Sequence, residues 1–246
     1  MSQKLLSKGT TNAKTAKNSL PTFILYLAPY RTALSSYNVC PMATKGCIES
    51  CLFTAGFAGV YHSVNEARIR KTKFFLENQL GFLVQLSDEL TKINSKGIKT
   101  AIRLNGTSDL DLIRLLNKKI NFDCFSLKNL IFYDYTKVPN KIETYLPDSR
   151  EKYLPKVNRY VLTFSRSENN WPDCERFLKL GVNVSVLFDH KKPLPKVYQG
   201  FKVVDGDKSD IVMLKQKGVI LGLRAKGKAK KDTTGFVVRD LNKVAI

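Results

Sequence analysis

The sequence predicts an α/β fold of about six βα units, whose parallel strands form a complete or partial (β/α) barrel. Two observations predict it. Short apolar segments alternate with helical segments over most of the chain, an order typical of βαβ units and a parallel sheet. The chain also has neither an internal repeat nor a Gly-rich G-x-G-x-x-G loop, the motif of dinucleotide-binding folds. An open sheet with the same winding is the alternative.

Core strands are expected where short apolar runs end at turn residues or charged residues. These runs cover residues 22–29, 97–104, 129–135, 159–165, 182–189 and 219–225. A further short strand is expected at 201–206 and an edge strand at 235–240. The segment around 139–146 fits neither pattern clearly.

Helices are expected at residues 62–75, 79–96, 108–119, 171–181 and 207–218. Ser63 and Glu66 have the spacing of a capping box, which satisfies free amide groups at a helix start. Gly97 and Gly181 follow two of these helices, at the position where glycine commonly ends a helix. The helix at 79–96 also carries an apolar stripe at helical spacing, made of Leu80, Leu83, Leu86, Leu90 and Ile93.

The length of 246 residues fits one domain. Residues 1–20 are basic and polar without apolar periodicity, so they are expected to be a flexible arm. Residues 21–246 are expected to form a single α/β domain that ends in a basic segment, 224–246.

The charge of the chain is far from balanced. A formal net charge of +20 is well above the magnitude of roughly 2–8 typical of a small soluble domain, and it favours a polyanionic partner, nucleic acid above all. A highly soluble, Lys-rich protein is the plainer alternative. The start has no secretory pattern, and the best apolar run, FILYLA, is too short to span a membrane. We therefore expect a cytoplasmic protein without a membrane partner.

Basic side chains gather in two places along the chain. The helix at 62–75 carries several, and a cationic run follows the strand at 219–225. In each case a solvated surface is the alternative, and Lys71 on the apolar helix face could extend to its edge. The candidate contacts to nucleic-acid phosphates are Arg68, Lys71, Arg224, Lys226, Lys228, Lys230 and Lys231.

Polar residues follow nearly every predicted strand. Because the carboxyl ends of parallel strands meet at one edge of the sheet, these residues are expected to line one site. The candidate catalytic residues are Arg103, Asn105, Asp134, Tyr135, Ser165 and Arg166. Asn105 and Thr107 are also candidates for binding a cofactor.

Cys40, Cys47 and Cys51 lie in the loop after the first predicted strand. Clustered cysteines in a reducing compartment more often bind metal than form disulfides. Structural zinc normally takes four ligands, often from closely spaced cysteine pairs, and the Cys-x6-Cys-x3-Cys spacing is wider. Small residues of a compact loop are a second alternative. A [4Fe-4S] cluster is the favoured interpretation, because three thiolates leave one iron open to a further ligand.

A three-cysteine loop directly after the first strand of such a fold resembles the layout of radical S-adenosylmethionine enzymes. Their usual spacing is Cys-x3-Cys-x2-Cys, from which this chain departs. The resemblance implies that S-adenosylmethionine binds at the open iron, where an electron from the cluster cleaves it.

Over residues 22–238 the chain also resembles the gene-product-88 family of tailed phages and related mobile elements. The motifs that carry the resemblance are NVCPMATKGCIESCLFTAG, ARIRKTKFF, RLNGTSD, FYDYTK, LTFSRSENN, GVNVSVLF, GDKSD and GLRAKGKAKKDTTGFVV. It implies phage origin and a shared site built from these motifs. Some members are labelled replication initiators, but the isolated His62 and His190 do not match the paired histidines of such enzymes.

The favoured function is a phage-encoded iron–sulfur enzyme of the radical S-adenosylmethionine kind that acts on a nucleic acid or a nucleotide. The alternative is a nucleic-acid-binding replication protein, of initiator or nuclease type, whose cysteines close a structural zinc site. The sequence predicts neither the substrate nor the oligomeric state.

Overall fold

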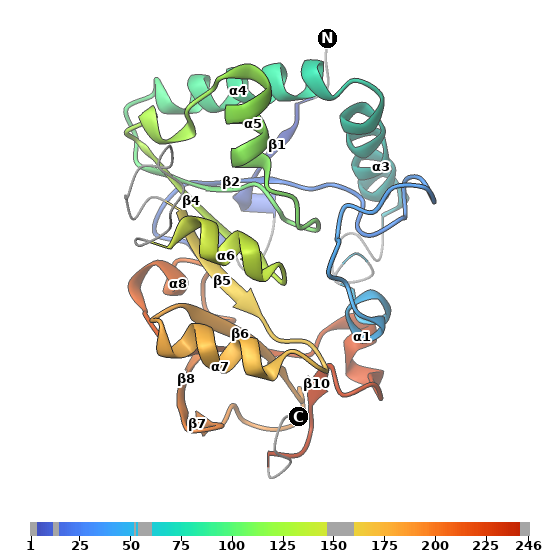
Figure 1. Cartoon of the computed structure of the whole chain (residues 1–246), viewed down its shortest axis with the longest axis vertical. Coiled ribbons are helices and arrows are strands. Elements are labelled where there is room, and N and C mark those ends of the chain that lie inside the picture. The colour runs from blue at the N-terminus through green and yellow to red at the C-terminus, as the bar shows by residue number, and fades with distance from the viewer. Residues whose placement is uncertain (1–3, 12–14, 52, 54–60, 147–159, 242–246) are drawn as a thin grey trace.

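A computed structural model describes residues 4–11, 15–51, 53, 61–146 and 160–241. Its described strands form one ten-stranded sheet, in the order β1-β2-β3-β4-β5-β6-β9-β8-β7, with β10 beside β6. The fold is therefore mixed α/β, as the sequence predicts (Figure 1). Pairing runs from β1 at one edge to β7 at the other, and no described strand joins these edges, so barrel closure is not observed.

The core of the sheet is parallel. Its strands are β2 (Thr22–Leu25), β3 (Thr100–Arg103), β4 (Leu130–Thr136), β5 (Tyr160–Ser165), β6 (Asn183–Phe188), β9 (Ile220–Arg224) and β8 (Phe201–Asp205). The short edge strands β1 (Leu6–Lys8) and β7 (Val197–Tyr198) are antiparallel to their neighbours, and β10 (Val237–Val238) runs parallel to β6. The strands expected at 201–206 and 235–240 are thus present as β8 and the shorter β10.

One face of the sheet carries most of the helices. The larger core cluster joins the sheet to α3 (His62–Glu77), α4 (Gln79–Asn94), α5 (Leu112–Ile120), α6 (Pro139–Tyr145) and α7 (Trp171–Lys179). Strands β2 to β6 follow each other in chain order, and right-handed crossovers without a reversal place the connecting helices on the same side. The order reverses after β6, where β9 lies between β6 and β8, as at the switch point of a doubly wound sheet.

The opposite face has a smaller core, which includes Tyr133 of β4, Leu221 of β9 and Met213 of the short helix α8 (Val212–Lys215). The alternation along β4 shows how the sequence serves both faces, because Phe132 belongs to the helix-side cluster and Tyr133 to the other.

The helix signals were correct in part. Helix α4 matches the segment expected at 79–96, although Leu80 of its stripe is 56% exposed. Asp111 caps α5 by accepting the amide hydrogen of Arg114. The expected cap of α3 is wrong, because this helix begins at His62 after Tyr61 and has no side-chain cap. Helix α6 occupies the segment that fitted no pattern.

The sequence predicts a flexible arm over residues 1–20, but the structure packs part of this segment against the sheet and α4. Strand β1 pairs with β2, and the amide hydrogens of Leu5 and Leu6 bind the carboxylate of Glu89 on α4 at 2.8 and 2.9 Å. Both leucines are buried. Two buried leucines are therefore enough to dock this segment, although two apolar residues form no recognisable pattern in the sequence.

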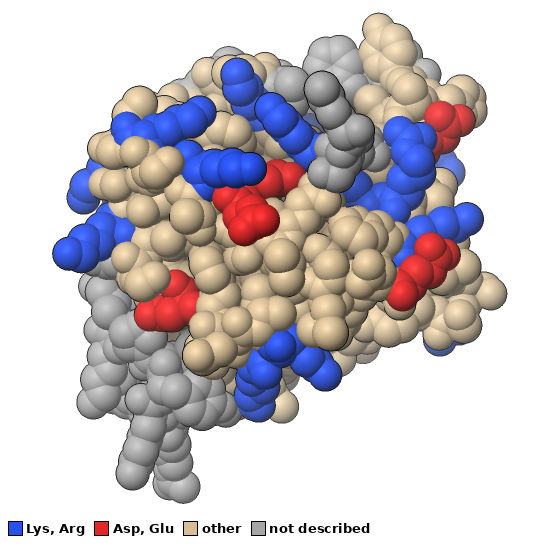
Figure 2. Space-filling model, turned by 90° about the horizontal axis from the view of Figure 1, so that it is seen from above, with Lys and Arg blue, Asp and Glu red and all other residues tan. Residues whose placement is uncertain are grey.

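The described helices include none with the length and apolar character needed to cross a membrane. Basic side chains are widespread on the surface, and Figure 2 shows them in several separate groups, with acidic side chains between them, on the face seen from above.

Candidate metal centre

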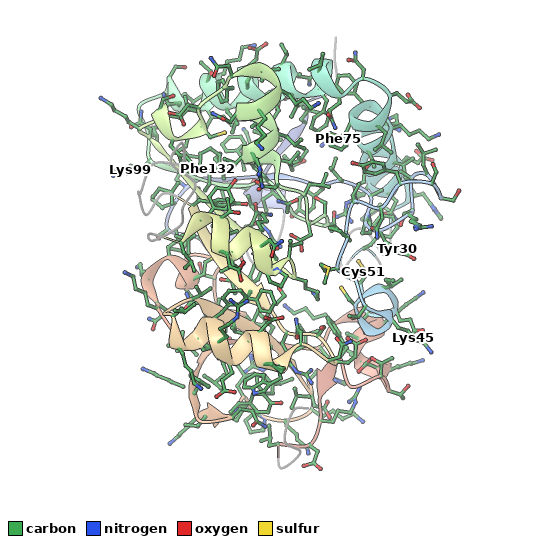
Figure 3. All side chains as sticks on the ribbon, viewed as in Figure 1. Tyr30, Lys45, Cys51, Phe75, Lys99 and Phe132 are labelled. Atoms are coloured by element: carbon green, nitrogen blue, oxygen red, sulfur yellow. The ribbon has the colours of Figure 1, made fainter. Side chains whose placement is uncertain are left out.

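The loops at the carboxyl ends of β2 to β5 meet around the three clustered cysteines. Cys47 lies on the short helix α1 (Lys45–Glu49). Cys40 precedes this helix and Cys51 follows it. None of the three is in a disulfide bond, and each is partly buried. Figure 3 shows Cys51 between the segment that carries Tyr30 and helix α1, which carries Lys45. The predicted placement of the cysteine loop at this edge is thus what the structure has.

Cys40 is held against the loop that follows β3. Its Sγ accepts the amide hydrogen of Tyr30 at 3.3 Å and lies 3.7 Å from the carbonyl oxygen of Thr107. The Thr107 hydroxyl donates to the carbonyl of Leu27, and the Asp109 amide donates to the carbonyl of Val39 at 2.8 Å. These contacts fix the β2 and β3 loops to each other.

Cys47 is positioned by Glu168, which follows β5. The Glu168 carboxylate accepts the Thr44 hydroxyl at 2.6 Å and the Gly46 amide hydrogen at 2.7 Å. Thr44 in turn caps α1 by accepting the amide hydrogen of Cys47 at 3.3 Å. A carboxylate at the first turn of a helix satisfies amide groups that have no partner in the helix.

Gly46 allows α1 to pack closely against the C-terminal segment. A Cβ atom at this position would lie 2.6 Å from Cβ of Phe236 and 2.8 Å from Oε1 of Glu168. Phe236 belongs to the segment that continues into β10, and Arg166 donates from Nη1 to the carbonyls of Gly235 and Phe236 at 2.8 and 2.9 Å. Segments far apart in the chain therefore enclose the helix that carries Cys47.

Burial and neighbouring groups shift the pKa values of Cys40 and Cys51. The pKa of Cys40 is raised to about 12, mainly by burial, with further raising effects of Asp109, Cys51 and Cys47 and a lowering effect of the Tyr30 amide. Burial also raises the pKa of Cys51, against the lowering effect of Lys137 and Arg68. Buried thiols of this kind stay protonated at neutral pH and are poor nucleophiles. A bound cation would reverse this preference, because metal ligation favours the thiolate.

The donor set differs in how well it suits the two expected metals. Among the described residues, no three His, Cys, Asp or Glu side chains are grouped closely enough to hold one metal ion. Structural Zn²⁺ needs four donors at about 2.0–2.3 Å from a single point, so the arrangement does not fit a closed zinc site. An iron–sulfur cluster takes thiolate ligands at different iron atoms, and three cysteines on one loop suit it in number and kind.

Two predicted pocket residues are part of the core instead. Asp134 is fully buried and accepts hydrogen bonds from the amide and the side chain of Asn105, and from the hydroxyl of Tyr160 at 3.0 Å. Asn105 also accepts from the hydroxyl of Ser108 and the amide of Leu110. Burial raises the pKa of Asp134, and Lys141 and Arg103 oppose this. These two residues hold the β3 loop in place.

The other predicted residues are divided between two places. Arg103 lies on the sheet face opposite the large helices, 3.6 Å from the carboxylate of Asp210 and 4.8 Å from the ring of Tyr135. Ser165 is nearly buried and accepts the hydroxyl of Ser185 at 3.1 Å. Arg166 binds the C-terminal segment, as described above. The structure therefore brings Thr107 and Arg166 to the cysteine loop and directs Arg103 toward Asp210, beside the ring of Tyr135.

The model of the gene product 88 family matches residues 3–240 of the chain. The chain belongs to the gene product 88 family. Comparisons with curated proteins and with solved structures gave no match.

The basic residues of this gene product 88 protein differ in what they contact. The ammonium of Lys71 is buried and donates to the carbonyl of Leu5 at 2.7 Å, so its prediction as a nucleic-acid contact is wrong for this structure. Arg224 and Lys226 form ion pairs with Asp205 and Asp207. The cationic run continues as a short 3-10 helix, η5 (Gly227–Lys231), on which three lysines are exposed: Lys228, Lys230 and Lys231.

Sequence reasoning missed the anchors of the cysteine loop in this gene product 88 protein. Glu168 and Lys137 both follow predicted strands, so their place at the carboxyl edge was visible. Their contacts were not visible in the sequence. Glu168 binds α1. The amide of Lys137 donates to Asp109 at 2.7 Å, and its ammonium lies 5.3 Å from the ring of Phe236. Thr44 three residues before Cys47 is the one local signal, since it is a good helix-capping residue.

Proposed function

We propose that this protein is an iron–sulfur enzyme in which Cys40, Cys47 and Cys51 hold a [4Fe-4S] cluster. The observation that carries the proposal is the convergence of these thiols at the carboxyl edge of the parallel sheet, where Cys47 and Cys51 raise the pKa of Cys40, and Cys47 raises that of Cys51. Active sites of parallel α/β folds lie at this edge.

The surrounding residues suit a negatively charged centre. The amide of Tyr30 donates to Cys40, and hydrogen bonds to the sulfur ligands are one means by which proteins tune such clusters. Lys137 and Arg68 lower the pKa of Cys51 from two different elements, the loop after β4 and helix α3. Both favour loss of the thiol proton, which must occur when a metal binds.

When bound, a cluster with three thiolate ligands supplies an electron and an iron atom open to an external ligand. We propose S-adenosylmethionine as that ligand and a nucleic acid or nucleotide of the phage-infected cell as the substrate. The support is the position of the cysteine loop directly after β2, the first strand of the parallel series, together with the basic character of the chain.

The test is anaerobic purification followed by iron, sulfide and zinc analysis. We expect iron and acid-labile sulfide in similar amounts and broad visible absorption, all lost in Cys47→Ser. Cys124→Ala and Cys174→Ala are matched controls, since both cysteines are buried in the helix-side core, and they should keep the cluster. A colourless wild type with one tightly held zinc would contradict the proposal.

That second result would favour the other candidate, a non-enzymatic nucleic-acid-binding protein. The observation behind this candidate is the exposed lysines of η5, which follow β9 at the same carboxyl edge. Lysines of this kind contact phosphates without reading the sequence.

A further inference from the structure

Arg68 is a cation with two buried donor atoms for which the described structure holds no hydrogen-bond acceptor. It lies on α3, and its Nε and Nη1 atoms are buried and bond to no acceptor. Burial lowers its pKa, because it disfavours the charged form, and Tyr26 and Cys51 oppose this. Leaving a buried donor of a charged group unsatisfied destabilises the folded protein. Such a cost is usually offset by a ligand, an ion or a water molecule.

The guanidinium is nevertheless well positioned. Its central carbon lies 4.8 Å from the ring centroid of Tyr26 and 5.6 Å from that of Phe53. The hydroxyl of Thr72, one helical turn further along α3, accepts the amide hydrogen of Ala28 at 2.8 Å, so α3 is fixed to the loop that follows β2. The Tyr26 ring is also fixed, because a Cβ at Gly106 would lie 2.5 Å from it.

Three features thus meet at Arg68: a charged group with free donors, two aromatic rings that hold it, and the neighbouring thiol of Cys51. Guanidinium groups are well suited to carboxylates and phosphates, since their planar set of donors matches the acceptor oxygens. The aromatic rings add attraction to the cation while leaving its edges available for hydrogen bonds.

We propose that Arg68 binds an oxyanion, a carboxylate or phosphate group, of a small ligand that lies beside Cys51. The site of that ligand rests on the proposed function, in which the cysteines hold the reactive centre; the anion-binding role of Arg68 does not. The buried position of the guanidinium favours a small ligand over the backbone of a duplex, which contacts exposed cations.

The experiment is calorimetric titration of the full-length protein, with and without iron, using inorganic phosphate and succinate as probes at constant ionic strength. We expect one saturable site for one of the two anions, and a loss of affinity of about tenfold or more in Arg68→Gln. Phosphate binding indicates a nucleotide-like ligand, and succinate binding indicates an amino-acid-like one. Arg68→Lys should bind with intermediate affinity, because it keeps the charge but loses the planar donors.

Arg70→Gln is the matched control, since Arg70 lies on the same helix and its side chain is 58% exposed; it should bind as the wild type does. Equal binding by wild type and Arg68→Gln, or no binding of either probe, overturns the proposal. If the wild type carries no iron, the proposed function fails, but anion binding is still measured on that protein. A folded Arg68→Gln protein that keeps its iron and sulfide but loses anion binding supports the proposal.

Discussion

At the scale of single residues, glycine 46 is the position where the cysteine loop has least room. Its α-carbon faces the segment around Phe236 and the carboxylate of Glu168, and a methyl group would have to push one of them away. Because Phe236 is itself buried, neither neighbour can move without loosening the packing of α1.

Gly46→Ala is therefore expected to reduce the free energy of unfolding by about 1–3 kcal/mol, as overpacked sites do. It should also lower the iron content, because α1 carries Cys47. Chemical denaturation and metal analysis measure the two effects. Lys45→Ala is the control, since this neighbour is exposed and should change stability by less than about 0.5 kcal/mol. Normal stability and iron loading in Gly46→Ala would show that α1 tolerates displacement.

Lys71 shows how a buried cation can serve the fold. Its ammonium donates to the carbonyl of Leu5, and burial lowers its pKa while Glu89 raises it. Lys71→Ala should reduce the free energy of unfolding by about 1–3 kcal/mol, because that carbonyl loses its partner. Lys73→Ala on the exposed side of the same helix should have an effect below about 0.5 kcal/mol. Urea unfolding of both variants checks this, and equal effects would argue against the role of Lys71.

At the scale of elements, the short strand β10 depends on one carboxylate. Asp232 accepts the hydroxyl of Thr234 at 2.6 Å and the amide hydrogen of Val237 at 2.9 Å. Burial alone would raise the pKa of Asp232, but these hydrogen bonds and the charge of Arg239 outweigh it, and the pKa is lowered from 3.8.

The sign of the pH effect follows from this lowered pKa. Ionised Asp232 stabilises the fold above its unfolded pKa, and the stabilisation is lost as the pH falls through the folded pKa. Asp232→Asn should therefore be less stable than wild type by about 1–2 kcal/mol near neutral pH, with a smaller difference at acidic pH. Urea unfolding at several pH values measures this. Asp173→Asn, on α7, is the control, and a difference that does not shrink on acidification would contradict the assignment.

Elements were predictable where local pattern and packing agree. The segment expected at 79–96 became α4 because most of its apolar stripe faces the core. Helix α6 has only Lys141 and Ile142 buried, so it carries no clear period. Strand β1 has three residues and depends on pairing with β2. Short elements held by distant partners leave little trace in a local pattern.

The candidate site was predictable only in part, for the same reason. The place of the cysteines at the sheet edge follows from their position after β2. The hydrogen-bond partner of Gly46 is Glu168, which is 122 residues away in the chain. That of Lys71 is Leu5, which is 66 residues away. Asn105 follows β3 and Asp134 lies near the end of β4, and only the structure shows that their hydrogen-bonding groups are used within the core.

At the scale of the whole molecule, part of the basic C-terminal run that was predicted to contact nucleic acid is paired with neighbouring carboxylates. Arg224 and Lys226 are neutralised by Asp205 and Asp207. The lysines of η5 remain exposed at the carboxyl edge of the sheet, so they are the part of the basic C-terminal run best placed to contact a nucleic acid.

If nucleic acid binds there, its affinity should fall steeply with salt, and replacing Lys228, Lys230 and Lys231 by Gln should reduce the slope of log affinity against log salt by roughly 2–3. Titration of labelled single-stranded and duplex probes measures this. Lys99, Lys118 and Lys128 are exposed near the opposite, amino edge of the sheet, and their replacement should leave the slope nearly unchanged. Equal effects of the two triple variants would mean that binding is not localised.

The C-terminal segment that packs against Gly46 also has a consequence for biosynthesis. The ribosome makes the cysteine loop early, but Glu168 comes much later and Phe236 almost last. During translation the three thiols are therefore exposed without their supports. Insertion of the proposed cluster would have to wait for nearly complete chains, and oxidants have the longest access to these sulfur atoms while the protein is still being made.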